Sequence, residues 1–316
     1  KLISFLNSEI AKKHMKYNIT FFGVKSTSSK VIDYLISEGY KIDLLVSLDE
    51  ECVKKHHISG FQNLRGIASK YNIEYLALND YELKDKKDLE FFNSNEFSIG
   101  ISYGWQRLIP DNILSKFESG VFGFHGSSKY LPEGKGRSPL NWSIIEDRKV
   151  IHNHLFKYGT GADEGPIFNI MDFNIEELDD ISNLQEKSIE TAKVQLKELL
   201  TAYKENNIKL TKQSGKSTYY PKRTPSDGKI DFNNTLREIY NLIRGVTKPF
   251  PGAFCYNKEN KVTIWKALIH EEDIDGKIGE VVKVIDDKPV IKLKDGLLII
   301  NDYESTNKLK INDILI

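Results

Sequence analysis

The sequence contains little cysteine: among its 316 residues only Cys52 and Cys255 carry thiols, and they lie far apart in the chain. Two such residues can form neither a disulfide framework nor, by themselves, a zinc site. Because disulfides are rare in reducing compartments, this usage is typical of buried thiols in a cytosolic protein. We therefore expect a cytoplasmic protein without a structural metal ion.

Long apolar runs are also missing. No stretch approaches the ~20 apolar residues that a membrane-spanning helix needs. The segment Lys1–Met15 has no long apolar core followed by a small-residue cleavage site, so it does not resemble a secretory signal. The sequence thus predicts no membrane partner.

Neither sign of charge is in excess, because Lys plus Arg and Asp plus Glu both number 45. Nucleic-acid-binding domains usually carry a basic surplus, so the balance argues against a nucleic-acid partner. Standard nucleotide-binding loops are missing as well: no Gly-x-Gly-x-x-Gly follows the first strand-like segment, and no P-loop sequence occurs. Gly159-Thr-Gly161 is too short a match and is interpreted as a turn.

Residues 19–125 alternate between strand-like and helix-like patterns. Such alternation indicates βαβ units and a mostly parallel sheet. Strands are expected at Ile19–Val24, Ile42–Leu48, Ile73–Leu78, Phe97–Tyr103 and Val121–His125. Helices are expected at Ser28–Tyr40, Phe61–Tyr71 and Pro110–Phe117.

The pattern changes after about Ile151. Two strands, Val150–Lys157 and Ile167–Phe173, precede a long helix over Ser182–Tyr203, where Ser182 and Gln185 have capping-box spacing. A polar segment, 211–231, leads to a helix over 235–246 with Thr235 and Glu238 at the same spacing. The short strands that follow favour a small β-barrel or open sheet: Val262–Ala267, Ile278–Ile285, Pro289–Lys292 and Leu297–Asn301.

Two segments expected at the carboxyl ends of strands carry reactive side chains, His125 and Asp163. A carboxylate beside a histidine favours the imidazolium and orients the ring, so the two make a proton-transfer pair. His152 and His154 alternate along one strand and could hold a metal together with His125. No fourth ligand lies nearby in the sequence, so we expect no metal.

A basic, glycine-containing loop lies between these two segments. Lys129, Lys135 and Arg137 flank glycines that let the backbone approach a ligand closely, as a phosphate site requires. A solvated basic loop explains the same residues equally well.

The chain contains, in this order, the motifs His125, Ser127, Leu131-Pro132, Gly136-Arg137-Ser-Pro139 and Asp163-Glu-Gly165-Pro-Ile167. Together they resemble the core of the folate-dependent formyltransferases. The run Arg137-Ser-Pro-Leu-Asn-Trp142 is most similar to the branch that formylates nucleotide-linked 4-amino sugars. Lys222–Asp231, Ile243-Arg244 and Pro249–Phe254 resemble the linker and second domain of sugar and methionyl-tRNA formyltransferases.

The resemblance implies a Rossmann-like, mostly parallel N-terminal formyltransferase domain and a smaller, mainly β C-terminal domain. We expect an N-terminal helical extension at 1–16, the catalytic domain at 17–210, a linker at 211–233 and a C-terminal helix with a β domain at 234–316.

The resemblance also implies the reaction: transfer of a formyl group from 10-formyltetrahydrofolate to the amine of a UDP- or dTDP-linked amino sugar. His125 and Asp163 would be catalytic. The folate would contact Trp105, Gln106, Arg107, Leu108, Ile109, Gly161, Ala162 and Asp163, and the sugar nucleotide Ser127, Lys129, Lys135, Arg137 and Asn141. A homodimer acting in lipopolysaccharide or O-antigen sugar synthesis is expected by the same analogy.

One position departs from the family pattern: the Asn two residues before the catalytic His is Gly123 here. By resemblance that Asn donates a hydrogen bond to the formyl oxygen, and loss of one such donor typically lowers the rate about 10²–10³-fold. One hypothesis is that His154 replaces it; Asn141 is a second candidate. A methionyl-tRNA formyltransferase, a formyl-folate hydrolase and a non-catalytic binding relative are the alternatives.

Overall fold

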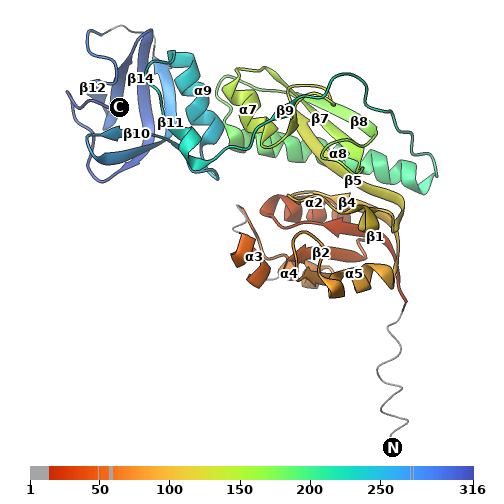
Figure 1. Ribbon diagram of the computed structural model, residues 1–316. Coiled ribbons are helices and arrows are strands. Elements are labelled where there is room, and N and C mark those ends of the chain that lie inside the picture. The colour runs from red at the N-terminus through yellow and green to blue at the C-terminus, as the bar shows by residue number, and fades with distance from the viewer. Residues whose placement is uncertain (1–13, 49, 57–59, 271, 273) are drawn as a thin grey trace, which may run out of the picture. The chain divides into compact units, whose positions relative to one another are not determined.

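The computed structural model describes residues 14–48, 50–56, 60–270, 272 and 274–316 (Figure 1). The predicted helical extension at 1–16 lies outside these ranges except for His14, Met15 and Lys16, and Lys16 already belongs to the first strand.

One sheet has seven strands, in the order β3-β2-β1-β4-β5-β7-β8. His125 lies on one of these strands, and Asp163 lies in a loop that follows another. The pairs β1–β2, β2–β3, β1–β4 and β4–β5 are parallel, which confirms the predicted Rossmann-like sheet. The strands are β1 (Lys16–Phe22), β2 (Leu44–Leu48), β3 (Glu74–Leu78), β4 (Glu96–Ser102), β5 (Phe117–Ser127), β7 (Val150–Lys157) and β8 (Ile167–Asn174).

Helices cover both faces of this sheet because successive strand residues point to opposite sides. Phe21 and Leu45 enter one hydrophobic cluster, whereas Phe22 and Leu44 enter another. The first cluster receives α2 (Ser26–Ser37), α4 (Arg65–Lys70) and the second half of α8 (Ile181–Lys204). The second receives α3 (Glu50–His56), α5 (Lys86–Asn93) and α6 (Asp111–Leu114).

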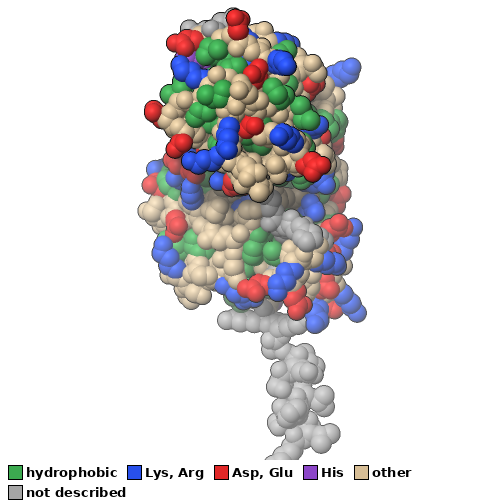
Figure 2. Space-filling view, turned by 90° about the vertical axis from the view of Figure 1, so that its left-hand side faces the viewer, with side chains coloured by type: hydrophobic (Ala, Val, Ile, Leu, Met, Phe, Trp, Pro, Cys, Tyr) green, Lys and Arg blue, Asp and Glu red, His purple; other side chains and the backbone are tan. Residues whose placement is uncertain are grey.

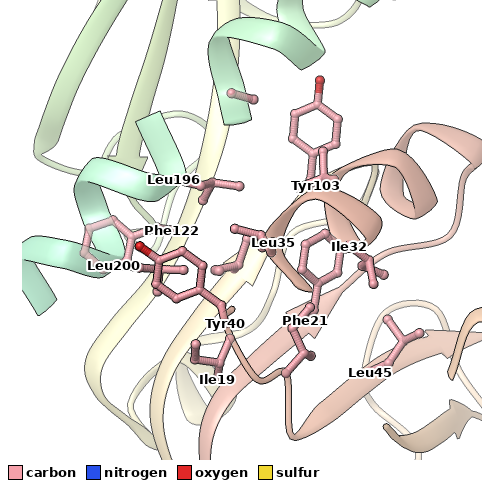
Figure 3. Close-up of a cluster of buried hydrophobic side chains, with 14 of the residues drawn as sticks. Ile19, Phe21, Ile32, Leu35, Tyr40, Leu45, Tyr103, Phe122, Leu196 and Leu200 are labelled. Carbon is pink, nitrogen blue, oxygen red and sulfur yellow. The ribbon is translucent and has the colours of Figure 1, made fainter. Parts of the chain in front are cut away.

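The first of these clusters fixes the strand that bears His125. Figure 3 shows Leu196 and Leu200 of α8 packed with Phe122 of β5 and Tyr40. Phe122, Leu196 and Leu200 are fully buried, and burying one such side chain stabilises a fold by roughly 1.5–3 kcal/mol. The backbone before His125 is therefore held rigidly.

Backbone contacts divide the chain into two compact units. One comprises 1–125, 153–171 and 189–216, and it contains His125, His154 and Asp163. The other comprises 126–152, 172–188 and 217–316, and it contains α7 (Pro139–Ile145) and α9 (Leu236–Val246). The limits 17–210, 211–233 and 234–316 remain our proposal for the division into domains.

The second unit contains an antiparallel five-stranded sheet in the order β10-β11-β14-β13-β12, which confirms the predicted β-rich C-terminal part. Apolar side chains of α9 pack into its core. The strands are β10 (Ala253–Asn257), β11 (Asn260–His270), β12 (Val281–Ile285), β13 (Lys288–Leu293) and β14 (Gly296–Ser305). The polar segment 211–231 holds β9 (Tyr219–Tyr220), which pairs with β6 (Lys135–Gly136), and the 3₁₀ turn η1 (Pro225–Gly228).

The two predicted capping boxes have different outcomes. Thr235 and Glu238 do cap α9 reciprocally. The one at Ser182 is wrong, because α8 already begins at Ile181 and the Asp180 carboxylate accepts the N–H groups of Ser182 and Asn183, at 2.8 and 3.2 Å. An aspartate before the first turn is as good a cap as serine, and it precedes Ser182 in the chain.

Candidate active site

His125 and Asp163 lie together in the first unit. His125 projects from β5 and is 5% exposed, whereas Asp163, in the loop after β7, is 20% exposed. The His125 Nδ1 and Asp163 Oδ2 atoms are 3.5 Å apart. This distance is longer than a good hydrogen bond, yet it suffices for the carboxylate to orient the imidazole.

The backbone of the loop that carries Asp163 is constrained from several sides. Asp163 has a φ of 56°, in the left-handed region that non-glycine residues seldom adopt. Gln213 Nε2 donates to the carbonyls of Asp163 and Gly165, both at 2.8 Å. A Cβ at Gly165 would lie 1.4 Å from the carbonyl oxygen of Lys157, so only glycine fits there. These contacts fix the backbone of the loop that places the Asp163 carboxylate 3.5 Å from His125.

Gly123 lies two residues before His125 on β5, and Tyr158 occupies the space beside it. A Cβ built on Gly123 would lie 2.1 Å from the Tyr158 hydroxyl oxygen. That hydroxyl donates to Ser102 Oγ at 3.2 Å. Burial raises the pKa of Tyr158 to about 12; the Ser102 bond opposes this rise and the Asp163 charge adds to it. The phenol is therefore protonated at neutral pH. Sequence reasoning did not identify Tyr158, because no motif marks it.

His154 lies on β7 and is completely buried. Its Nδ1 is 3.1 Å from the backbone carbonyl oxygen of His125. A carbonyl only accepts hydrogen bonds, so Nδ1 carries the hydrogen in this contact. The Nδ1 edge of the ring thus supports the backbone at His125.

The predicted folate loop combines buried and exposed residues. Trp105 is buried edge-on against Tyr81, and its indole N–H has no hydrogen-bond partner among the described residues. The backbone N–H of Gln106 donates to the Tyr81 hydroxyl, and the Arg107 guanidinium lies over the Tyr81 ring. Leu108 is 59% exposed, whereas Ile109 is buried. An unsatisfied buried donor and an exposed apolar side chain in one loop suit a flat, polar-edged ligand.

The residues predicted to bind the sugar nucleotide belong to the second unit, and only some of them reach its surface. Arg137 is exposed and Lys129 is partly so, with its ammonium 5.0 Å from the Tyr220 ring centre. Ser127, Lys135 and Asn141 are buried. The Asn141 amide donates to the Gly245 carbonyl at 2.8 Å and so joins α7 to α9.

An aromatic cluster in the same unit was not anticipated. The Trp142 and Tyr220 rings stack with centres 5.8 Å apart, and the Arg223 guanidinium lies 4.8 Å over Trp142. The Tyr220 hydroxyl is anchored on Glu146 at 3.0 Å. Only the fold brings β9 beside α7, so no sequence pattern marks this cluster.

Metal-binding arrangements are not found in the described part of the chain, where no three His, Cys, Asp or Glu side chains gather suitably. His152 instead contacts Asp172 at 2.8 Å and stacks on Tyr130, with ring centres 3.8 Å apart. None of the described helices is both long and apolar enough to cross a bilayer.

Comparison with known proteins gives a consistent picture. Residues 222–315 match the family described as "Formyl transferase, C-terminal domain". The bifunctional polymyxin resistance protein ArnA of Wigglesworthia glossinidia brevipalpis is 32% identical over 246 residues. That alignment covers 75% of this chain but 36% of ArnA, so the chain spans about a third of this relative's length.

Two solved structures share the fold over most of the chain. HypX from Aquifex aeolicus in complex with tetrahydrofolic acid has a TM-score of 0.66 at 16% identity, covering 95% of this chain and 46% of HypX. An N-formyltransferase from Helicobacter canadensis, in complex with folinic acid and dTDP-3-aminofucose, has a TM-score of 0.64 at 20% identity, covering 90% and 99%. Residues 222–315 therefore belong to the family of formyl transferase C-terminal domains, three quarters of the chain is similar to ArnA, and the chain shares its fold with these two solved structures.

Proposed function

We propose that this protein transfers the formyl group of 10-formyltetrahydrofolate to the amine of a UDP- or dTDP-linked amino sugar. The observation that carries the proposal is the pairing of His125 with Asp163, 3.5 Å apart in the unit that contains the parallel sheet. Similarity to ArnA and to an enzyme that binds dTDP-3-aminofucose supports a sugar acceptor.

The predicted folate-binding residues fit such a donor. The unsatisfied indole N–H of Trp105 and the backbone of 105–109 would contact the polar edge of the pterin, and Leu108 its face. Gly161 and Ala162 would approach from the loop that carries Asp163. When bound, the donor supplies an activated formyl carbon.

In the proposed mechanism the protein positions the two reactants and moves one proton. Holding the sugar amine against the formyl carbon replaces much of the entropic barrier of a bimolecular reaction. His125 delivers a proton to the departing folate nitrogen, and Asp163 keeps the imidazole aimed at it. His154 supports this arrangement through the carbonyl of His125, and its direct role as an oxyanion donor stays a hypothesis.

The basic loop would bind the pyrophosphate of the carrier. Lys129 and Arg137 reach the surface of the second unit and attract anionic oxygens. Ser127 orders this loop, because its Oγ accepts the backbone N–H of Lys129 at 3.2 Å. Lys135 and Asn141, both buried, would act at the edge of the substrate site. The enzyme would work in the cytoplasm as a homodimer, supplying formylated sugars for lipopolysaccharide or O-antigen.

A tRNA acceptor is disfavoured by the charge distribution. The chain has no net charge, and Figure 2 shows acidic and basic side chains interspersed over the face that it displays. Polyanion binding of useful strength needs several unopposed Lys and Arg contacts to phosphates. A non-catalytic relative would rest on Gly123 alone, since His125 and Asp163 are both present.

The test is incubation of the protein with 10-formyltetrahydrofolate and a panel of UDP- and dTDP-linked 3- and 4-amino sugars. Mass spectrometry should detect one added formyl group on one member of the panel. Asp163→Asn should lower kcat about 10²–10⁴-fold, as loss of a proton-transfer partner does. An unmodified panel, with folate bound, would refute the sugar acceptor.

A further inference from the structure

We propose that the Tyr158 hydroxyl, which lies against Gly123 and is hydrogen bonded to Ser102, stabilises the negative charge that develops on the formyl oxygen during transfer. The inference rests on the proposed function. It gives Tyr158 the hydrogen bond to the formyl oxygen that, by resemblance to the family, an Asn at residue 123 would donate.

The position of the hydroxyl follows from the geometry of β5. Residues two apart on a strand project to the same face, so the side of Gly123 where a Cβ would be is also the side of the His125 imidazole. The Tyr158 oxygen lies 2.1 Å from that Cβ position. The phenol therefore fills the space where a side chain of residue 123 would begin, two residues before His125 on the same strand.

Tyr158 is held at this place from both ends. Its backbone N–H donates to the Val121 carbonyl of β5 at 2.7 Å. Its ring packs on Phe156, with centres 5.3 Å apart, and its hydroxyl reaches Ser102 at the end of β4. A donor whose oxygen is fixed before the reaction needs little reorganisation when charge appears, which is the requirement for an oxyanion site.

The chemical state of the phenol suits a donor. Burial keeps its pKa at about 12, so it holds its proton through the physiological range. Each hydroxyl has one hydrogen and can accept as well as donate. Ser102 Oγ–H can therefore turn to donate to the Tyr158 oxygen, which frees the phenolic hydrogen for the formyl oxygen.

The step balances without any further reactant. The amine nitrogen bonds to the formyl carbon, and the C=O π electrons move onto the oxygen, which receives the Tyr158 hydrogen bond. When the C=O bond re-forms, the bond from carbon to the folate nitrogen breaks. That nitrogen takes a proton through His125, the amine loses one, and Tyr158 keeps its own.

His154 is less well placed for this task. It is completely buried, and its Nδ1 hydrogen is directed at the carbonyl of His125. The Tyr158 oxygen, in contrast, lies on the imidazole's own face of the strand.

The decisive variant is Tyr158→Phe, which removes one oxygen and keeps the ring. We expect kcat to fall about 10²–10³-fold, the usual loss for one oxyanion donor, with KM for both substrates within about threefold. Ser102→Ala should lower kcat less than tenfold, because Tyr158 keeps its hydroxyl. Tyr40→Phe, a buried tyrosine in the core of the first unit, is the matched control and should change nothing.

A second readout does not need the acceptor. Infrared difference spectra of the ¹³C-labelled formyl group of bound 10-formyltetrahydrofolate report hydrogen bonding to its oxygen. The carbonyl stretch should move to lower frequency in the wild type and return towards the solution value in Tyr158→Phe, but not in Tyr40→Phe.

The outcomes separate the two proposals. Formyl transfer with equal kcat in the wild type and Tyr158→Phe would overturn the role of Tyr158 and leave the function standing. A Tyr158-dependent carbonyl shift without transfer to any amino sugar would support Tyr158 and overturn the acceptor. Failure to bind the folate would overturn both.

Discussion

Gly123 and Tyr158 depend on each other at the scale of single residues. Because a Cβ at residue 123 would lie 2.1 Å from the Tyr158 oxygen, Gly123→Ala must displace the phenol. We expect this substitution to lower the free energy of unfolding by about 1–3 kcal/mol, as overpacking does. It should cost much less in a Tyr158→Ala background, and urea unfolding of the four proteins measures the difference.

Gly66→Ala is the control for this comparison of four proteins. Gly66 lies in α4 with no atom within 4 Å of its Cβ position, so Gly66→Ala should be neutral or stabilising by about 0.5–1 kcal/mol. Equal costs for Gly123→Ala with and without Tyr158 would contradict the assigned packing. The same contact means that Gly123→Asn restores the family residue only together with removal of the Tyr158 ring.

Some contacts of the candidate site were predictable from the sequence and others were not, for a physical reason. The proximity of His125 and Asp163 was predictable, because both lie in segments expected at the carboxyl ends of strands. Tyr158 and the burial of Lys135 do not follow, because they depend on how a loop folds back over neighbouring strands. Such tertiary contacts leave no periodicity in one sequence.

The first prediction at the scale of elements concerns the loop from Tyr158 to Pro166. Gly165→Ala would place a methyl 1.4 Å from the Lys157 carbonyl, so the loop must open and Asp163 must leave His125. We expect formyl transfer to drop at least 10²-fold. Gly159→Ala, whose nearest neighbour is 3.7 Å away, is the matched control and should retain activity. Comparable losses in both would indicate a generally intolerant loop.

The second prediction at the scale of elements concerns the N-terminus of α9. Thr235 and Glu238 satisfy each other's backbone N–H groups there, so Thr235→Ala should lower the free energy of unfolding by about 1 kcal/mol. Thr201→Ala, at an exposed position inside α8, should stay within about 0.5 kcal/mol of the wild type. Denaturant titration with both variants tests the cap, and a cost below that of Thr201→Ala would reject it.

Long periodic helices were easier to predict than short ones. The helix predicted at 182–203 corresponds to α8, whereas α3, α5 and α7 were missed and the helix predicted from Phe61 begins only at Arg65. A segment of two turns shows too few apolar positions for a period to stand out. Strand β10 was also missed, and only its first two residues belong to the Pro249–Phe254 motif.

The whole molecule should lose stability at alkaline pH. Burial raises the pKa of Tyr158 and of the Cys255 thiol to about 12, and it raises the pKa of Tyr220 and Tyr240 in the same direction. The folded state therefore holds these protons more tightly than the unfolded chain does. Their contribution to stability is complete below about pH 9, and it is lost as the pH rises towards about 12.

Urea unfolding between pH 8 and pH 11.5 measures this loss. The midpoint should be nearly constant up to about pH 9 and then fall steadily. Tyr158→Phe should make the alkaline decline shallower, because one titrating group is removed. A midpoint that stays level to pH 11.5 would contradict the burial of these groups.

At this scale the sequence predicted the architecture well. Alternating strand and helix patterns predicted the parallel sheet, and the short strands after residue 252 predicted the β-rich part. Both follow from local hydrophobic periodicity, which a single sequence displays. The grouping of 126–152 with the C-terminal segments was not predictable, because it depends on contacts such as that between Asn141 and Gly245.

The most direct test of the proposed function traces the formyl carbon from the donor to the product. The protein is mixed with 10-formyltetrahydrofolate labelled with ¹³C in the formyl group and with a UDP- or dTDP-linked amino sugar, and NMR locates the label. We predict a labelled formamide on the sugar, formed about 10²–10⁴-fold more slowly by His125→Asn. Label in free formate would instead indicate hydrolysis, with water in place of the amine, and would contradict the proposed function.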